Sequence, residues 1–287
     1  MPGERVVRPG ELTAAERAAV RVAVVADPDP ATLATFPALE WVQSTWAGVE
    51  RMLAELPPAI GIARMVDPRL AEVMGEAVLT AVLWLHRDGP AYAAQRRTRV
   101  WRDLGYRRPE RRTVAVLGLG ALGRAAAERL VANGFRVIGW SRTARSIDGV
   151  RTRAGEDGLR AALGEADIAV NLLPHTPATE GLLDADALGA MPPGASLVNF
   201  GRGATVSEPT LLAALDAGHL AHAFLDVFAT EPLPADHPFW AHPSVTVWPH
   251  VSAPTDPETA SLVVAAAIRE WRRTGTPPAL VDRARGY

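Results

Sequence analysis

From Thr113 onward, short apolar runs alternate regularly with helix-length segments, and this alternation constrains the fold more than any other feature. The expected strands are 113–117, 135–140, 167–172, 195–199, 221–226 and 245–249. Helical patterns at 121–133, 156–164 and 208–217 lie between some of them. Strands separated by helix-length crossovers pair in parallel. We therefore predict an α/β fold with a doubly wound parallel sheet.

A glycine-rich turn, GLGALG at residues 118–123, directly follows the first of these strands. Gly118 permits a tight turn, Gly120 keeps side chains away from a pyrophosphate, and Gly123 lets the next helix pack close to the strand. The amino terminus of that helix then faces the negative charge. The turn predicts a dinucleotide site, and the alternative is a glycine turn without a ligand. The predicted contacts are Gly118, Gly120, Ala121, Leu122 and Gly123.

The second strand of this region ends in Ser141 and Arg142, where an Asp or Glu would normally bind the ribose hydroxyls. A hydroxyl beside a guanidinium suits a 2′-phosphate, because Arg pairs bidentately with phosphate and stacks on adenine. Arg145 is a candidate second contact. We therefore expect NADP to be preferred. NAD, with Arg142 as an ordinary surface residue, is the alternative.

The residues before the glycine turn have a pattern of their own. Strands are expected at 20–25, 39–44 and 60–63, and a long helix at 70–85. Another long helix is expected at 257–273, with Thr255 or Asp256 as its cap. A length of 287 residues favours two domains over one.

Composition excludes several classes of protein. Apolar residues make up 48% of the chain and charged residues 22%, which is typical of globular proteins. A net charge of −2 gives no reason to expect a nucleic-acid or membrane partner. No apolar run is long enough to cross a membrane, and the first residues lack a signal peptide's apolar core, so we expect a cytoplasmic protein. The absence of Cys and Lys excludes disulfides and Schiff-base lysine chemistry.

Arginines are concentrated between residues 96 and 112. This stretch holds Arg96, Arg97, Arg99, Arg102, Arg107, Arg108, Arg111 and Arg112. A nucleic-acid patch and a solvated connector are both compatible with such a run. We favour the connector, because acidic residues elsewhere balance the charge.

Polar residues follow three of the predicted strands, at the sheet edge where doubly wound folds bind ligands. They are Arg202, Glu231 and His250. Reduction of a 2-oxo acid needs a cation for the carboxylate and ketone, and an acid that titrates near neutrality. A carboxylate beside an imidazole favours its protonated form. The structural alternatives are a turn cap for Glu231 and a satisfied core histidine for His250.

These motifs together resemble the D-isomer-specific 2-hydroxyacid dehydrogenases, closest to their glyoxylate/hydroxypyruvate reductase branch. The resemblance runs roughly over residues 39–254. Its most specific segments are residues 118–123, 171–181, 199–203, 225–228 with 231–232, and 249–252.

The resemblance implies how the site is divided among residues. Arg202 would bind the 2-oxo acid, His250 would be the general acid in reduction, and Glu231 would orient and charge it. Asp226 would hold the nicotinamide end of the cofactor, while Pro174, with His175 and Thr176, would line the cofactor cleft. The backbone amides of a loop at Trp46, Ala47 and Gly48 would meet the substrate carboxylate. No metal is expected.

The resemblance also implies the domain organisation. A smaller, flavodoxin-like substrate domain would comprise residues 1–85 and 255–287. A Rossmann domain would comprise residues 86–254, with catalysis in the cleft between the two. A homodimer is implied as well, and Trp101 matches a tryptophan that in some reductases reaches into a neighbour's site; an exposed linker residue is the alternative.

The chain departs from the family pattern in several places. Its amino-terminal region is short, so the first domain is expected to lack an edge strand or helix. Trp46 stands where many relatives have a small residue, which could narrow the pocket or provide an aromatic contact. Ser207 occupies a position that is often acidic, and we expect this to affect only the start of a helix.

Two other functions remain compatible with the same fold. A dinucleotide-sensing interaction protein would need only the cofactor half of the site, and the presence of Arg202, Glu231 and His250 argues against it. A dehydrogenase for another small anion, such as formate or phosphite, gives His250 a less clear task. We therefore expect NADPH-dependent reduction of a small 2-oxo acid to the D-2-hydroxy acid.

Overall fold

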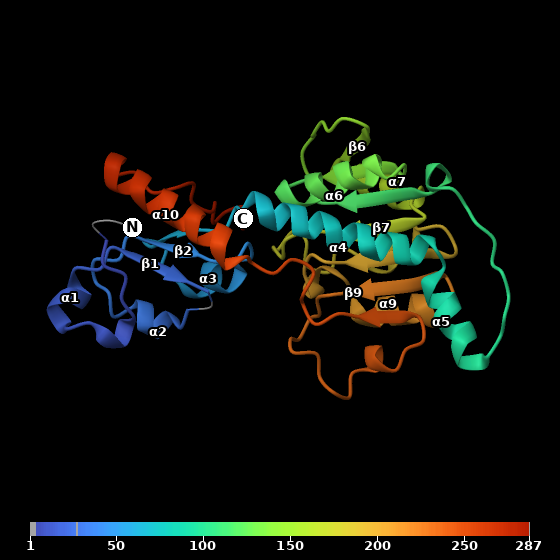
Figure 1. The fold of residues 1–287 in the computed structure, drawn as a ribbon, viewed down its shortest axis with the longest axis horizontal. Helices are drawn as coiled ribbons and strands as arrows, with labels where there is room; N and C mark the ends of the chain where they lie inside the picture. The colour runs from blue at the N-terminus through green and yellow to red at the C-terminus, as the bar shows by residue number, and fades with distance from the viewer. Residues whose placement is uncertain (1–3, 27, 287) are drawn as a thin grey trace. The chain divides into compact units, whose positions relative to one another are not determined.

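A parallel sheet forms the centre of the larger of two compact units, Leu70–Pro254 (Figure 1). The computed structural model describes residues 4–26 and 28–286. The strands of this sheet are β4 (Thr113–Leu117), β5 (Arg136–Ser141), β6 (Val150–Ala154), β7 (Ile168–Asn171), β8 (Ala195–Asn199), β9 (Leu220–Leu225) and β10 (Val245–Val247). Among the described residues their spatial order is β10-β9-β8-β7-β4-β5-β6, and every neighbouring pair is parallel. The predicted fold class is confirmed.

The strand order reverses between β4 and β7, which pair with each other although β5 and β6 lie between them in sequence. Crossovers from these two strands leave the sheet in opposite directions, so their carboxyl ends bound a ligand crevice. The glycine turn follows β4 and the Pro174 loop follows β7. Both segments therefore start at the position where this fold binds dinucleotides.

Helices cover both faces of the large sheet. One face packs against α4 (Pro68–His86) and α6 (Ala121–Ala132). The other packs against α7 (Gly155–Gly164), α8 (Ala185–Gly189) and α9 (Glu208–Asp216). In α6 the buried residues Gly123, Ala126, Ala127 and Leu130 follow helical spacing, which gives one narrow apolar face. Small residues on that face bring the helix close to β4.

The two compact units divide at Arg69–Leu70, whereas the predicted domain boundary lies between residues 85 and 86, and that domain assignment stays a prediction. The cause is the packing of α4. Its residues Met74, Val78 and Val82 belong to the same apolar cluster as Val114 of β4 and Leu130 of α6. The helix expected to end the first domain thus completes one face of the larger sheet.

The smaller unit comprises residues up to Arg69 and from Thr255 onward. Its strands β1 (Val22–Val25), β2 (Trp41–Ser44) and β3 (Gly61–Ala63) form a parallel sheet in that order. On one face α10 (Pro257–Thr274) packs its Trp271 against Trp41. Apolar residues from α2 (Pro30–Leu33) and α3 (Glu50–Glu55) belong to the cluster on the other face, and α1 (Ala14–Ala18) precedes β1. Asp256 caps α10 by accepting the amides of Glu258 and Thr259, as one of the two predicted caps.

Val281 and Arg283, near the end of the chain, are bonded to other segments of this smaller unit. Arg283 donates to the backbone carbonyls of Leu53, Leu56, Pro57 and Ile60, at the end of α3 and just beyond it. The amide of Val281 also donates to Ile62 in β3, at 2.7 Å. Carbonyls at a helix end lack partners within the helix, so one guanidinium satisfies several at once.

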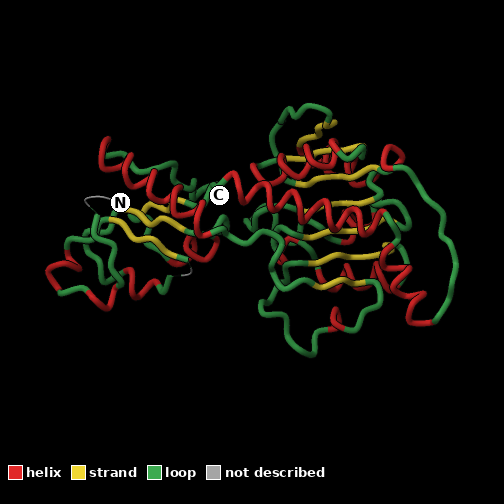
Figure 2. The backbone as a smooth tube through the Cα atoms, in the orientation of Figure 1, coloured by secondary structure: helices red, strands yellow, loops and turns green. Residues whose placement is uncertain are grey.

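The arginine-rich stretch is partly helical. Helix α5 (Gly89–Thr98) includes Arg96 and Arg97. Residues 100–108 then run without helix or strand to a short 3₁₀ helix at Pro109–Arg111 (Figure 2). Trp101 lies on this segment and is fully exposed.

Further short 3₁₀ helices are Pro9–Glu11, Gly203–Thr205 and Pro238–Trp240. Within the described part of the chain, no helix has the length and apolarity needed to span a membrane.

Candidate active site

The glycine turn brings the backbone of β4 close to the start of α6. Gly118 has a φ of 99°, a conformation that side chains disfavour. A Cβ on Gly123 would lie 1.7 Å from the Gly118 carbonyl oxygen, so only glycine permits this packing. Gly120 is the N-cap of α6, and no described atom lies within 4 Å of where its Cβ would be. The space beside Gly120, at the start of α6, is therefore open, as the approach of a pyrophosphate would require.

The loop after β5 carries the residues predicted to select the cofactor. The Ser141 hydroxyl donates to the Thr143 carbonyl at 2.7 Å, which folds the loop back at the strand end. Arg142 and Arg145 are exposed. Arg124 of α6, which the sequence analysis did not single out, donates to the Ser146 carbonyl at 3.0 Å. The loop is therefore anchored at both ends while its cationic side chains face outward.

Arg202 lies just beyond β8, above a buried polar network. Its backbone carbonyl accepts hydrogen bonds from Asn199 Nδ2 at 3.2 Å and from Thr205 Oγ1 at 2.6 Å. Asn171, at the end of β7, donates to both of those side chains, at 2.9 and 2.6 Å. Asn171, Asn199 and Thr205 are all almost completely buried. Buried polar groups with their partners satisfied hold one conformation, so the backbone at Arg202 is rigidly placed.

His250 and Glu231 form a directly bonded pair. His250 Nδ1 lies 2.7 Å from Glu231 Oε2, and both side chains are partly exposed. This hydrogen bond raises the pKa of His250 above its ordinary value, against the opposing effects of burial and of Arg202. Burial pushes the pKa of Glu231 upward, but hydrogen bonds from His250 and the Phe228 amide outweigh it and hold that pKa low. The pair therefore favours an imidazolium beside a carboxylate.

The three residues singled out by sequence lie within electrostatic reach of one another. Arg202 lowers the pKa of both His250 and Glu231, which places its charge near the pair. Each residue follows a different strand: Arg202 follows β8, Glu231 follows β9 and His250 follows β10. Because parallel strands end at one edge of the sheet, three loops distant in sequence meet there. The arrangement places a guanidinium near an imidazole that is bonded to a carboxylate.

Asp226 is buried and bonded to the loop that carries His250. Its carboxylate is fully buried, and its two oxygens accept the amides of Val251 at 2.7 Å and Ser252 at 2.9 Å. The Asp226 carbonyl accepts the amide of His250 at 2.9 Å. His250 itself has a φ of 54°, in the left-handed region that non-glycine residues seldom adopt. Asp226 thus fixes the His250 loop; a cofactor contact by the same residue stays a prediction.

The loop after β7 is stabilised by its own side chains. Thr179 Oγ1 donates to the Pro174 carbonyl at 2.6 Å and accepts the Thr176 amide at 2.9 Å. His175 Nε2 lies 3.9 Å from Glu180 Oε2. The Leu173 amide donates to Asn171, which connects this loop to the network beneath Arg202.

The predicted substrate loop lies in the smaller unit, between β2 and α3. The amide of Trp46 donates to the Ser44 hydroxyl at 2.9 Å, and its carbonyl accepts the amide of Met65 at 2.9 Å. The Trp46 side chain is about half exposed, while Ala47 and Gly48 are of intermediate exposure. Trp46 is therefore held by its backbone and exposes its indole.

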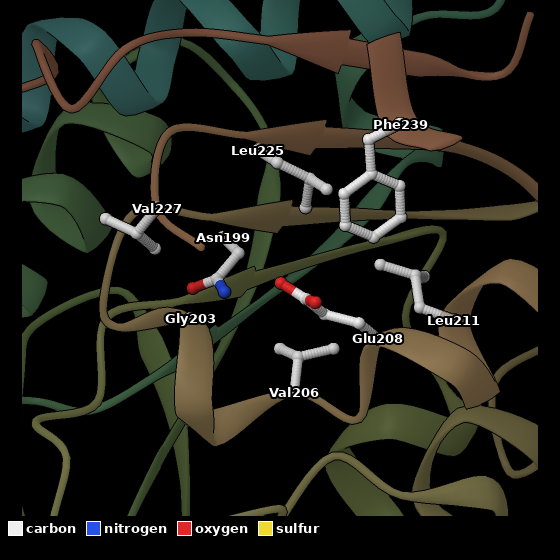
Figure 3. A pocket seen from close by; sticks show the side chains of 8 residues that line it. All are labelled: Asn199, Gly203, Val206, Glu208, Leu211, Leu225, Val227 and Phe239. Atoms are coloured by element: carbon white, nitrogen blue, oxygen red, sulfur yellow. The ribbon is translucent and has the colours of Figure 1, made fainter. Parts of the chain in front are cut away.

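A small pocket behind the Arg202 loop contains a carboxylate that sequence reasoning missed. It is lined by Asn199, Gly203, Val206, Glu208, Leu211, Leu225, Val227 and Phe239 (Figure 3). Glu208, the first residue of α9, points into it. The departure from the family pattern was noted instead at the neighbouring Ser207, whose hydroxyl is 2.8 Å from Thr210 Oγ1. An acidic residue in the first turn of a helix is common, so the sequence held no stronger signal.

A family comparison matches residues 79–252 to the model described as D-isomer specific 2-hydroxyacid dehydrogenase, NAD binding domain. Among curated proteins, the glyoxylate/hydroxypyruvate reductase A of Yersinia enterocolitica is 39% identical over 272 residues, which cover 92% of this chain and 87% of the relative. The protein of that name from Serratia proteamaculans gives the same identity and coverage.

Solved structures show the same likeness. The NADPH-dependent glyoxylate/hydroxypyruvate reductase of Sinorhizobium meliloti, in complex with NADP and sulfate, superposes with a TM-score of 0.93 at 36% identity, covering all of this chain and 93% of the other. A 2-hydroxyacid dehydrogenase of Xanthobacter autotrophicus Py2, in complex with NADPH and MES, gives 0.91 at 39% identity, covering 94% and 86%.

Proposed function

Because the chain belongs to the D-isomer-specific 2-hydroxyacid dehydrogenase family, we propose that it reduces a small 2-oxo acid, of the glyoxylate or hydroxypyruvate type, to the D-2-hydroxy acid with NADPH. Membership in the family makes the protein an NAD(P)-dependent oxidoreductase. The proposal goes beyond family membership in naming the class of substrate and the role of each side chain. The observation that carries them is the bonded His250–Glu231 pair beside Arg202.

His250 is the proposed proton donor. Glu231 engages Nδ1, which fixes the ring's orientation and leaves Nε2 to serve the substrate oxygen. A pKa above the ordinary histidine value keeps the imidazolium populated near neutral pH, where a general acid must carry its proton. In the oxidative direction the neutral ring would take the proton back.

Arg202 is the proposed binding residue for the 2-oxo acid. A guanidinium presents several donors in one plane and matches a carboxylate bidentately. The network of Asn171, Asn199 and Thr205 holds its backbone, so the cation is placed before substrate arrives. Preorganised donors aimed at developing charge are an effective source of rate enhancement.

The residues of the glycine turn fit a dinucleotide. The open space beside Gly120 and the amides at the start of α6 suit a pyrophosphate, and Ser141, Arg142 and Arg145 are the proposed contacts of a 2′-phosphate. The NADP-bound Sinorhizobium meliloti relative supports this preference. Pro174 and Asp226 are the proposed contacts toward the nicotinamide. When bound, the reduced nicotinamide supplies the hydride that reduces C2 of the substrate.

The loop of the smaller unit is proposed to meet the substrate carboxylate. The Trp46 amide is already engaged by Ser44, so the amides of Ala47 and Gly48 are the proposed donors. The half-exposed Trp46 indole is proposed to limit the size of the substrate's side chain. A pocket restricted in this way favours two- and three-carbon acids.

The test is a panel of small 2-oxo acids with NADPH and with NADH, followed by loss of the reduced-nicotinamide absorbance. We expect turnover with glyoxylate and hydroxypyruvate, at least tenfold better kcat/KM with NADPH, and D-glycerate as the product of hydroxypyruvate on a chiral column. A tenfold preference for NADH contradicts the cofactor assignment. Absence of oxidation with every 2-oxo acid contradicts the reaction.

We further propose that the enzyme is a homodimer and that the segment carrying Trp101 takes part in the assembly. The support is the complete exposure of this indole on a stretch without helix or strand. Light scattering coupled to size exclusion measures the mass directly. We expect a dimer that Trp101→Ala weakens, and a monomer in the unaltered protein contradicts the assembly.

A further inference from the structure

The backbone at Phe228 and Ala229 is held from three sides. The Phe228 amide donates to Glu231 Oε1 at 2.9 Å, and the Ala229 amide donates to Glu208 Oε1 at 3.0 Å. On the third side, a Cβ on Gly203 would lie 1.9 Å from the Phe228 carbonyl carbon. The chain one residue after Arg202 therefore rests directly on the loop that carries Glu231.

The second oxygen of Glu208 is also occupied. His237 Nε2 lies 3.4 Å from Glu208 Oε2, and both side chains are about four-fifths buried. His237 Nδ1 accepts the Phe239 amide at 3.3 Å, so the ring carries its proton on Nε2, the nitrogen that faces Glu208. The His237 ring also packs against Phe239, which in turn packs against Phe228. His237, whose ring is held by its own contacts, thus orients the Glu208 carboxylate toward the Ala229 amide.

We propose that Glu208, oriented by His237, is a positioning residue that holds the loop 228–231 and thereby places Glu231 against His250. The Phe228 amide binds Glu231, and the adjacent Ala229 amide binds Glu208. The position of Glu231 therefore depends on the anchor that Glu208 provides. Glu208 touches no reacting atom in this arrangement. Its effect reaches His250 through Glu231. The catalytic consequence rests on the proposed reductase function, whereas the structural consequence does not.

The alternative is that Glu208 serves only the stability of α9. An acidic residue in the first turn of a helix stabilises that helix through its interaction with the helix dipole, whatever lies around it. The chain offers a matched control in Glu258, an exposed acidic residue in the first turn of α10. Glu258→Ala removes a comparable helix-terminal charge without touching the catalytic loops.

Three variants test the proposal: Glu208→Ala, Glu208→Gln and Glu258→Ala. Glu208→Ala should lower kcat about tenfold with the KM for cofactor unchanged within about twofold, since displacement of a catalytic group acts mainly on turnover. Glu208→Gln keeps an oxygen for the Ala229 amide and should lose only about threefold, with the His237 contact weakened. Glu258→Ala should match the unaltered protein in kcat.

A second readout does not require activity. The pKa of His250 can be followed by nuclear magnetic resonance, with its ring signal identified by its loss in His250→Gln. In Glu208→Ala this pKa should fall toward the ordinary histidine value, because the Glu231 hydrogen bond that raises it is loosened. The groups that face His250 are Glu231, Arg202 and Asp226, and none of them is altered in these variants.

Unchanged kcat and an unchanged His250 pKa in Glu208→Ala would overturn the proposal, as would a loss in Glu208→Gln equal to that in Glu208→Ala. If Glu208→Ala does not fold, Glu208→Gln and His237→Ala decide the question, because each should still lower the His250 pKa and spare cofactor binding. If the unaltered protein reduces no 2-oxo acid, the proposed function fails. The titration of His250 then still tests whether Glu208 holds Glu231 against His250.

Discussion

Two sets of loops leave the same edge of the large sheet, and they are built differently. The loops after β8, β9 and β10 carry Arg202, Glu231 and His250, and buried Asn199 and Asp226 hold their backbones. The loop after β5 carries Arg142 and Arg145, and its residues 142–146 are all exposed.

The difference separates two tasks. A proton donor and a carboxylate-binding cation must be placed to within a fraction of an ångström, which requires buried, fully bonded supports. Discrimination between two cofactors that differ by one phosphate requires only cationic side chains within reach. In the proposed assignment the rigid loops therefore carry the chemistry, and the exposed loop carries a cofactor preference that substitution can alter without unfolding the protein.

The largest effect is expected at the rigid loops. His250→Ala removes the proposed proton donor and should lower turnover by about 10² to 10⁴-fold, the range that general acid catalysis contributes. NADPH binding, measured by fluorescence titration, should stay within about twofold of the unaltered protein, because the glycine turn is untouched. Near-normal turnover in this variant excludes His250 as the proton donor.

Glu231→Gln should act on the pH dependence as well as on the rate. In the proposed mechanism reduction needs protonated His250, so kcat/KM should be full at low pH and should fall as the pH rises through the raised pKa of that residue. Burial and Arg202 both lower the pKa of His250, and in this variant the Glu231 carboxylate no longer opposes them. The fall in kcat/KM should therefore begin at lower pH. The rate at neutral pH should drop on the order of tenfold to a hundredfold, part of the same catalytic factor. A pH profile identical to that of the unaltered protein is the contrary result.

The exposed loop should respond only in cofactor choice. Arg142→Ala should raise the KM for NADPH about tenfold, since one charge-assisted contact to phosphate contributes about 1.5–3 kcal/mol. The KM for NADH and the melting temperature should not change measurably. An equal loss with both cofactors would show that Arg142 does not recognise the 2′-phosphate.

The smallest effect is expected beneath Arg202. Thr205→Val keeps the side-chain volume but removes both the donor to the Arg202 carbonyl and one acceptor of the Asn171 amide, while Asn199 still bonds to each. We expect a loss of about 1–2 kcal/mol in unfolding free energy, as for other buried hydrogen bonds, and a several-fold fall in kcat. Urea unfolding and steady-state kinetics measure the two. If neither changes, the network is not what fixes Arg202.

Much of the large sheet could be predicted from sequence, for a physical reason. Strands in a parallel sheet with helices on both faces are apolar throughout, as in Val114–Leu117 and Ile168–Val170, and such runs are easily recognised. Strand β6 was missed because it lies at the sheet edge, where Arg151 and Arg153 face Glu165 instead of a core. An edge strand rich in arginine has the composition of a loop.

The family and its reductase branch could be recognised from the motifs, and both predictions are confirmed. The partners of those motifs could not be predicted. That the Asp226 carboxylate accepts two amides beyond β10, or that Glu208 accepts the Ala229 amide, depends on the paths of separate loops. The boundary at Arg69 depended likewise on which sheet α4 covers, which its helical pattern alone did not specify.

The left-handed backbone at His250 has a consequence for protein engineering. Glycine adopts this conformation freely, and asparagine tolerates it better than most residues, whereas histidine is held in it by its neighbours. Selection of variants for thermal stability alone would therefore favour replacing this residue, and would discard the proposed proton donor in doing so. Position 250 is one at which stability and activity favour different amino acids, so a library built for robustness should keep it fixed.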